Sequence, residues 1–121
     1  LSCARDRLRR EVAAVVSAPA KVPGVQLIQA PVFYGLAFTF AAKLATPADA
    51  AQLSAAAKSA GLLVKPGAGP SNLSVAGESS IQLSAPEPDA SSPNLWWFFG
   101  AADNIRLPAF NAVKLAEKLL S

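Results

Sequence analysis

The stretch from Leu36 to Lys43 constrains the fold more than any other part of the chain, because apolar side chains recur at every second position. Leu36, Phe38 and Phe40 fall on one side of an extended backbone, whereas Thr39 and Lys43 fall on the other. A period of two residues is typical of a strand with one buried face. The stretch is therefore predicted to form a strand.

Three further segments have the spacing or the end signals of helices. The first is Ala4–Val16, whose arginines lie away from its apolar side. The second is predicted to begin at Thr46, with this threonine as the cap, and to end near Ala60, before Gly61. The third, Pro108–Leu120, carries a stripe of alanine, valine and leucine side chains.

Short strands and loops are predicted for most of the remaining chain. The predicted strands are Leu62–Val64, Ile81–Leu83 and Leu95–Phe99, and the predicted loops are Lys65–Ser71 and Pro86–Pro93. The glycines of Lys65–Ser71 lack the lysine and the following helix of a phosphate-binding loop, so nucleotide binding is not expected there. Leu95–Phe99 carries large side chains on both faces, which predicts cover from the chain's own core or from a second subunit.

Composition bounds the answer independently. A chain of 121 residues, 52% hydrophobic and 16% charged, has the length of one domain and enough apolar residues for one compact core. The sequence has no methionine, so Leu1 cannot be a translational start and the chain is expected to be a fragment. The single cysteine, Cys3, excludes an internal disulfide and favours a reducing, cytoplasmic compartment. The apolar stretches are too short for a membrane span, which predicts a soluble protein.

The positive charge is concentrated near the start of the chain. Four arginines lie between Arg5 and Arg10, and no aromatic side chain is interleaved to stack on bases. Nucleic-acid binding is therefore not expected. Because Asp6 and Glu11 lie among the arginines, a solvated helix face with local ion pairs is favoured over an anion-binding site.

Two blocks of sequence resemble the aspartate-semialdehyde dehydrogenase family of amino-acid biosynthesis. The first is Gln29–Thr39, and the second is Ala102–Arg106 followed by Ala109–Val113. Their order and separation also agree with the catalytic, C-terminal half of those enzymes. The resemblance implies an α+β domain over residues 1–121, with a mixed, largely antiparallel sheet and helices on one face, as in the C-terminal domain of the glyceraldehyde-3-phosphate/aspartate-semialdehyde dehydrogenase type. In that family, the helix corresponding to residues 108–120 packs on a nucleotide-binding domain, which this chain lacks.

The residues that perform the chemistry in that family are replaced here. The family interconverts an acyl phosphate and a semialdehyde with NADP, through a cysteine thioester that lies upstream of this half. The resemblance places the general-base histidine at Leu36 and the arginine that holds the substrate carboxylate at Gln29. Leucine has no proton to exchange, glutamine carries no charge, and the chain contains no histidine. No catalytic residue and no metal site are therefore expected.

Weaker correspondences remain at Glu11 and Asn111. The resemblance places Glu11 at a substrate-binding glutamate, although an ion pair with Arg7 explains it equally well. Asn111 corresponds to an asparagine near the nicotinamide, and Asp103 and Asn104 also match the family. The favoured structural alternative is that Asp103 and Asn104 make a turn and that Asn111 caps or packs the helix. Cys3, beside Arg5, is not expected to act as a nucleophile.

These observations favour a catalytically inactive dimerisation and substrate half of a semialdehyde dehydrogenase-like protein. A homodimer is expected, together with contact to a nucleotide-binding domain of the parent protein; NADP would bind only in that full-length parent. Two alternatives stay open. One is a stand-alone protein-interaction module, and the other is a part of an active NADP-dependent enzyme with a divergent site.

Overall fold

The computed structural model describes residues 2–16, 21–28 and 34–120. The chain divides into two compact units, Leu1–Pro31 and Val32–Ser121. The sequence predicts a single core, and the buried apolar side chains of the described residues all belong to the second unit: Val75, Leu83, Phe98, Ala101 and Ala102.

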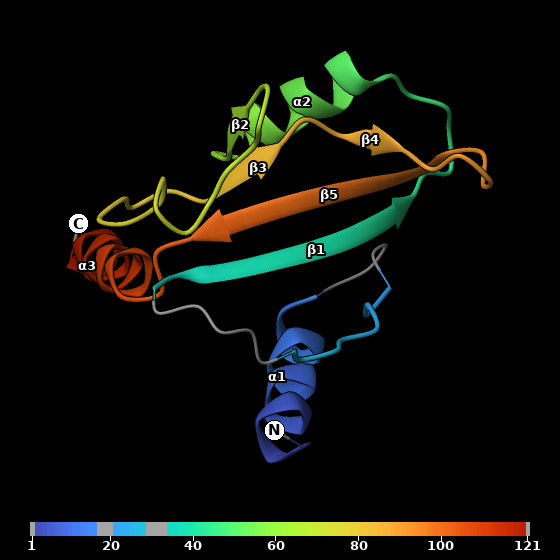
Figure 1. Ribbon diagram of the computed structural model, residues 1–121. Coiled ribbons are helices and arrows are strands. Elements are labelled where there is room, and N and C mark those ends of the chain that lie inside the picture. The colour runs from blue at the N-terminus through green and yellow to red at the C-terminus, as the bar shows by residue number, and fades with distance from the viewer. Residues whose placement is uncertain (1, 17–20, 29–33, 121) are drawn as a thin grey trace. The chain divides into compact units, whose positions relative to one another are not determined.

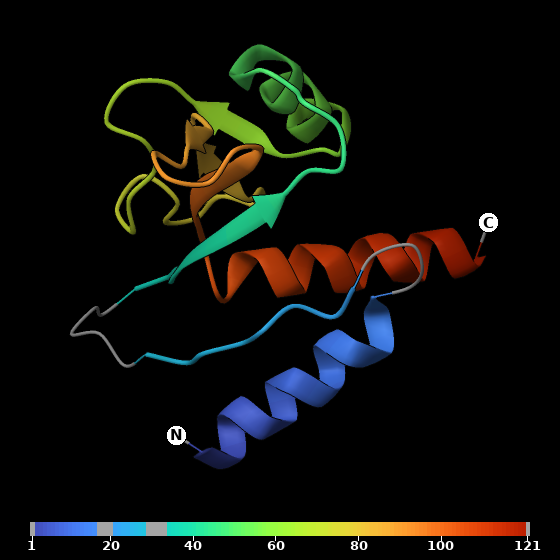
Figure 2. The same cartoon turned by 90° about the vertical axis from the view of Figure 1, so that its right-hand side faces the viewer.

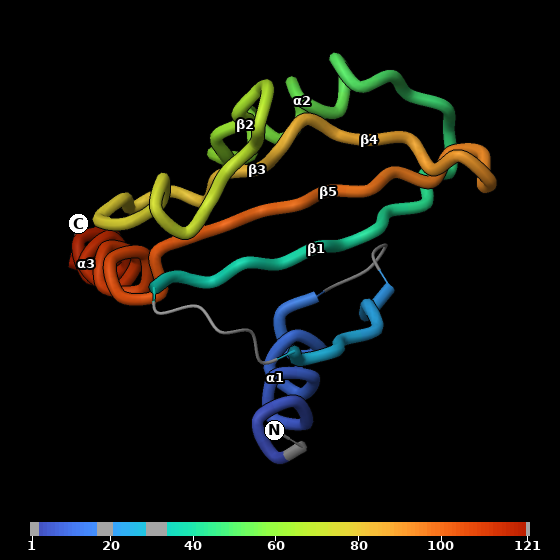
Figure 3. The backbone as a smooth tube through the Cα atoms, in the orientation of Figure 1, coloured from blue at the N-terminus to red at the C-terminus, as the bar shows by residue number. Residues whose placement is uncertain are grey.

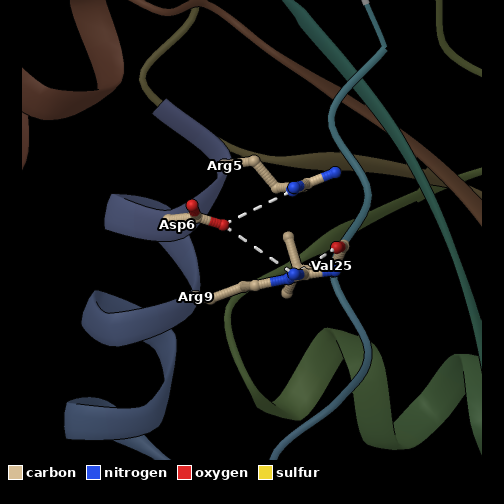
Figure 4. A network of polar contacts seen from close by, with 4 residues as sticks. All are labelled: Arg5, Asp6, Arg9 and Val25. Atoms are coloured by element: carbon tan, nitrogen blue, oxygen red, sulfur yellow. Dashed lines mark hydrogen bonds and ion pairs between the residues drawn. The ribbon is translucent and has the colours of Figure 1, made fainter. Parts of the chain in front are cut away.

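The first unit contains helix α1 (Ser2–Val15) and an extended segment at residues 21–28 that joins no strand. Figure 4 shows how polar contacts connect the two: Arg9 donates its Nε–H to the carbonyl oxygen of Val25 at 3.1 Å. Asp6 lies within ion-pair distance of both Arg5 and Arg9, at 3.5 and 3.8 Å. The predicted ion pairs on an exposed arginine-rich helix are confirmed.

The second unit is built on a five-stranded sheet, whose strands are seen in Figures 1 and 3. Strand β1 (Leu36–Lys43) lies at one edge, followed in space by β5 (Leu95–Ala102), β3 (Gln82–Ser84) and β2 (Leu63–Lys65). The short β4 (Glu87–Pro88) also pairs with β5. Only β2 and β3 run parallel, so the predicted α+β fold with a mixed, largely antiparallel sheet is confirmed.

Strands β1 and β5 pair along their whole length without a bulge, from Leu36 opposite Ala102 to Lys43 opposite Leu95. Residues directly opposite each other point to the same side of a sheet. One side, here called the first face, carries the side chains of Leu36, Phe38, Phe40, Leu83 and Phe98. The second face carries those of Thr39, Ala41, Gln82, Trp97 and Phe99.

Aromatic side chains pack against one another on the first face, where Phe98 is buried and Phe40 is partly exposed. The rings of Phe40 and Phe98 stack with 4.6 Å between centroids and an angle of 6° between planes. Beside them, Gly100 leaves the space that the tips of Phe38 and Leu83 fill: a Cβ there would lie 2.3 Å from Cζ of Phe38 and 2.8 Å from Cδ2 of Leu83. The glycine is therefore required by packing rather than by its backbone conformation.

Helix α2 (Ala50–Ser59) contacts β2, beside which it lies in Figure 2. The predicted cap, Thr46, is wrong. Asp49 is the N-cap: its carboxylate accepts the N–H of Gln52, and the Gln52 side chain accepts the N–H of Asp49. This reciprocal pair satisfies two N–H groups at once, an advantage that Thr46 lacks. At the other end Gly61 has a φ of 83°, which confirms the predicted left-handed residue after the helix.

The long segment between β2 and β3 is fastened to the sheet by a buried glutamine. Gln82 donates from Nε2 to the carbonyl oxygen of Ser74 at 3.2 Å and accepts the Ser74 hydroxyl at 3.3 Å. Val75, which is fully buried, follows directly. The second face is therefore covered where β3 meets β5.

Several predicted bounds differ from the structure; for example, β5 continues to Ala102, beyond the predicted end at Phe99. Helix α3 (Arg106–Leu120) begins at Arg106 rather than at Pro108. The stretch Pro86–Pro93, predicted as a loop, contains β4 and a turn that is held by hydrogen bonds of Asp89.

Candidate functional site

Leu36, the position at which the sequence predicts a lost catalytic base, is the first residue of β1. It pairs with Ala102 and its side chain is 53% exposed on the first face. Gln29, the position that the resemblance assigns to the substrate-binding arginine, lies outside the described residues. The assignment of both positions to one substrate site, which the resemblance implies, therefore stays a prediction.

The start of β1 and the end of β5 are joined by Asn104. Gly35 donates its backbone N–H to Oδ1 of Asn104 at 3.3 Å. Gly35 has a φ of 76°, and a Cβ at this position would come within 3.1 Å of the Ala102 carbonyl oxygen. The close approach and the positive φ both require glycine. The carboxamide of Asn104 thus supports the backbone next to Leu36.

Asp103 caps the amino end of α3. Its Oδ1 accepts the N–H groups of Ile105 and Arg106 at 2.8 and 2.6 Å, and its Oδ2 accepts that of Gly77 at 2.7 Å. The bonds from Arg106, Gly77 and Ile105 favour the charged form and lower the pKa of the Asp103 carboxyl. A carboxylate therefore already occupies the positive end of the helix dipole, where an anionic ligand would otherwise bind. The structural alternative for Asp103 and Asn104 is the one observed.

Asn111 lies on α3, more than one helical turn beyond Arg106, and is exposed. A shallow hollow on the same helix is lined by Arg106, Ala109, Phe110 and Val113. The structure thus brings Leu36 together with Asn104 through Gly35, whereas Asn111 belongs to the exposed helix. Its correspondence to a nicotinamide contact stays a prediction.

Glu11 is engaged within α1. Its Oε1 accepts a 2.7 Å hydrogen bond from Nε of Arg7, and both side chains are exposed. This contact raises the pKa of Arg7. Cys3, on the same helix, is a free and exposed thiol. The ion pair that the sequence offers as an alternative for Glu11 is present, and a role in substrate binding stays a prediction.

A second arrangement, not anticipated from the sequence, lies at the other end of β5. Trp97 and Phe99 are 44% and 42% exposed on the second face, although β5 is an interior strand. The Trp97 indole is held by Asp89, whose other carboxylate oxygen accepts bonds from Ser91 and Ser92. Asp89 with Ser91 and Ser92 is a turn signal in the sequence. The separation of eight residues between Asp89 and Trp97 matches no known motif, so the sequence did not indicate their hydrogen bond.

The described residues contain no group of three or more metal-ligating side chains. Within the same ranges, no helix combines the length and apolar character needed to cross a bilayer. No family model matches the chain, and no curated protein or solved structure is significantly similar to it.

Proposed function

We propose that this chain is a self-association domain: the dimerisation and substrate half of a protein resembling aspartate-semialdehyde dehydrogenases, without the acid–base chemistry of that family. The nucleotide-binding domain and any NADP site would belong to the parent protein. That protein would be cytoplasmic. The proposal combines the resemblance of two sequence blocks with the surface of the sheet.

The observation that carries the proposal is the exposure of large aromatic side chains on the edge strand β1 and its neighbour β5. Phe40, Trp97 and Phe99 are each more than two-fifths exposed, on two adjacent strands and on both faces. Apolar surface of this kind on a sheet is typical of an interface with another protein chain. A homodimer is the simplest assembly that covers it, since most oligomers are symmetric.

The proposed loss of catalysis is supported by the chemistry at the start of β1. Leu36 offers no group that transfers a proton, and the nearby polar side chains of Asp103 and Asn104 are occupied by backbone N–H groups. These residues support the strand and helix ends, which is a structural task.

Sedimentation of the chain over a wide concentration range tests the association. We expect a dimer that dissociates on dilution, and a Phe40→Lys variant that is folded but shifted toward monomer. Leu73→Lys is the matched control, because Leu73 is 85% exposed and lies away from the strands. A chain that is monomeric at every concentration would refute the proposal.

The catalytic part is tested on the parent protein. With aspartate semialdehyde, phosphate and NADP, we expect no NADPH formation above the uncatalysed rate. Turnover at a rate usual for dehydrogenases would instead favour the active enzyme with a divergent site.

A further inference from the structure

We propose that the free edge of β1 pairs with the same edge of a second copy of this chain, so that the two sheets form one continuous sheet about a two-fold axis. This inference rests on the proposed self-association and specifies the strand that mediates it.

The hydrogen-bond pattern shows which backbone groups of β1 face away from β5. Leu44 donates its N–H to the carbonyl oxygen of Asn94 at 2.8 Å, in the register that also pairs Leu36 with Ala102. Along an antiparallel ladder, residues that bond to the neighbouring strand alternate with residues that point away from it. The even-numbered residues of β1 therefore bond to β5. The N–H and C=O groups of Ala37, Thr39 and Ala41 point to the other edge.

Strand β5 agrees with this assignment. Phe99 donates its N–H to Oγ of Ser84 at 3.3 Å, on the side of β3. The backbone groups of odd-numbered β5 residues therefore point away from β1. Those of even-numbered β5 residues form the hydrogen bonds with β1.

The edge of β1 lacks the features that usually prevent strand pairing. Among the described residues, β1 pairs with β5 alone. It is eight residues long, regular, free of proline, and charged only at its last residue, Lys43. Protected edge strands are short, bulged, or interrupted by proline or inward-pointing charge. The edge is therefore a suitable template for another strand.

A second copy fits this edge in a specific register. With Thr39 opposite Thr39 of the second copy, Ala37 lies opposite Ala41, and the outward groups make about six hydrogen bonds between the chains. On the first face, Phe38 then lies opposite Phe40 of the second copy, a favourable cross-strand aromatic pair. This contact would cover Phe40, which is 42% exposed in the single chain.

Charge also permits the symmetric arrangement. In this register Lys43 lies opposite Gly35 of the second copy, and the two lysines are about 27 Å apart along the strands. Like charges therefore do not oppose each other across the axis. A self-complementary strand of this kind is what a two-fold interface requires.

The first experiment removes a backbone N–H group that takes no part in the pairing of β1 with β5. Ala41→Pro removes an N–H that points away from β5, and proline is tolerated at such edge positions. Because the axis duplicates the change, two inter-chain hydrogen bonds are lost, and we expect dimer dissociation to become at least about tenfold easier. Ala41→Ser keeps the N–H and is the matched control. Near-ultraviolet circular dichroism of the tryptophans checks that both variants are folded.

The second experiment reads the register directly. In the proposed dimer, the Cα atoms of the two Thr39 residues are about 5.5 Å apart, which is within the range of a disulfide. Thr39→Cys in a Cys3→Ser background should form an inter-chain disulfide under mild oxidation. Thr46 lies outside the strand, so Thr46→Cys in the same background should not form this disulfide.

The outcomes separate this inference from the proposed function. A dimer that persists unchanged in Ala41→Pro but weakens in Phe40→Lys would overturn β1 pairing and leave self-association intact. A monomeric wild-type chain would overturn both. If a segment of the same chain fills the edge, Ala41→Pro lowers the melting temperature without changing the sedimentation, and the inference is again wrong.

Discussion

The indole Nε1–H of Trp97 donates a 2.7 Å hydrogen bond to Oδ2 of Asp89. The Oδ1 atom of the same carboxylate accepts the N–H and hydroxyl of Ser91 and the N–H of Ser92. One carboxylate thus fixes both the turn between β4 and β5 and the orientation of an exposed aromatic side chain. Because these donors favour the charged form, with the Trp97 bond as the largest contribution, the pKa of Asp89 is lowered from 3.8 to about 2.

The lowered pKa of Asp89 predicts a loss of stability in acid. Between pH 3.8 and about 2 the unfolded carboxyl binds protons that the folded one does not, so the stabilisation is present above this window and is lost as the pH falls through it. Melting temperatures measured at intervals from pH 5 to pH 2 should fall. A Trp96→Phe background leaves Trp97 as the single tryptophan, whose fluorescence then reports the turn.

The isosteric variant Asp89→Asn is the comparison for this titration. It lacks the titrating group, so its melting temperature should be lower at pH 5 and should depend less on pH below 4. Equal pH profiles for the two proteins would show that Asp89 does not contribute. Asp103, whose pKa is also lowered, accounts for part of the remaining slope.

The capping role of Asp103 predicts a graded response to substitution. Asp103→Ala leaves the N–H groups of Ile105 and Arg106 without their acceptor, so the first turn of α3 should exchange its amide hydrogens faster. Asp103→Asn should restore most of the protection, because asparagine is also a good cap. Hydrogen exchange over the first residues of α3 measures this, and equal protection in wild type and Asp103→Ala would contradict the assignment.

The contact of Phe38 and Leu83 over Gly100 predicts a destabilising methyl group. Gly100→Ala should lower the free energy of unfolding by about 1–3 kcal/mol, a typical cost of overpacking a core. Since the Phe38 ring is nearest, Phe38→Leu should be less damaging in the Gly100→Ala background than in wild type. Denaturant titration measures the four proteins of this cycle. Gly24→Ala, at a glycine with open space around it, is the control and should be near neutral.

The hydrogen bonds of the buried Gln82 side chain to Ser74 predict a cost for an isosteric apolar replacement. Gln82→Leu leaves the Ser74 carbonyl oxygen without its amide donor, whereas the Ser74 hydroxyl keeps its bonds to the backbone of Ser71. The variant should destabilise the second unit by about 1–3 kcal/mol. Limited proteolysis should then cut the segment between β2 and β3 earlier than in wild type. The double variant Gln82→Leu, Ser74→Ala should not recover the loss, because Ser74→Ala also removes the bonds between the Ser74 hydroxyl and the backbone of Ser71.

The fold was predictable where a local rule decides the structure. The period of two at Leu36–Lys43 predicted β1 with its observed bounds, and Gly61 predicted the end of α2. The start of α2 was not predicted, because Thr46-Pro47 and Asp49 are both plausible caps and only the reciprocal bond with Gln52 distinguishes them. Strand β4 was missed because Glu87–Pro88 has no strand propensity and is held by its pairing with β5.

The site was predictable only in part. The sequence offered a turn as the alternative for Asp103 and Asn104, and a turn is observed there. It offered Asn111 rather than Asp103 as the residue that caps or packs the helix, whereas Asp103 is the cap. It could not show that Gly77, far along the chain, shares the Asp103 carboxylate. The Asp89–Trp97 bond was missed for the same reason: it depends on the register of β4 against β5, which no local pattern specifies.

The alternation along β1 divides its residues into two groups with different effects on mutation. Residues whose amides bond to β5 hold the strand in the sheet, whereas the backbone groups of the intervening residues contribute nothing to that ladder. Mutations at Ala37 or Ala41 can therefore create or abolish a quaternary contact while the tertiary structure is conserved.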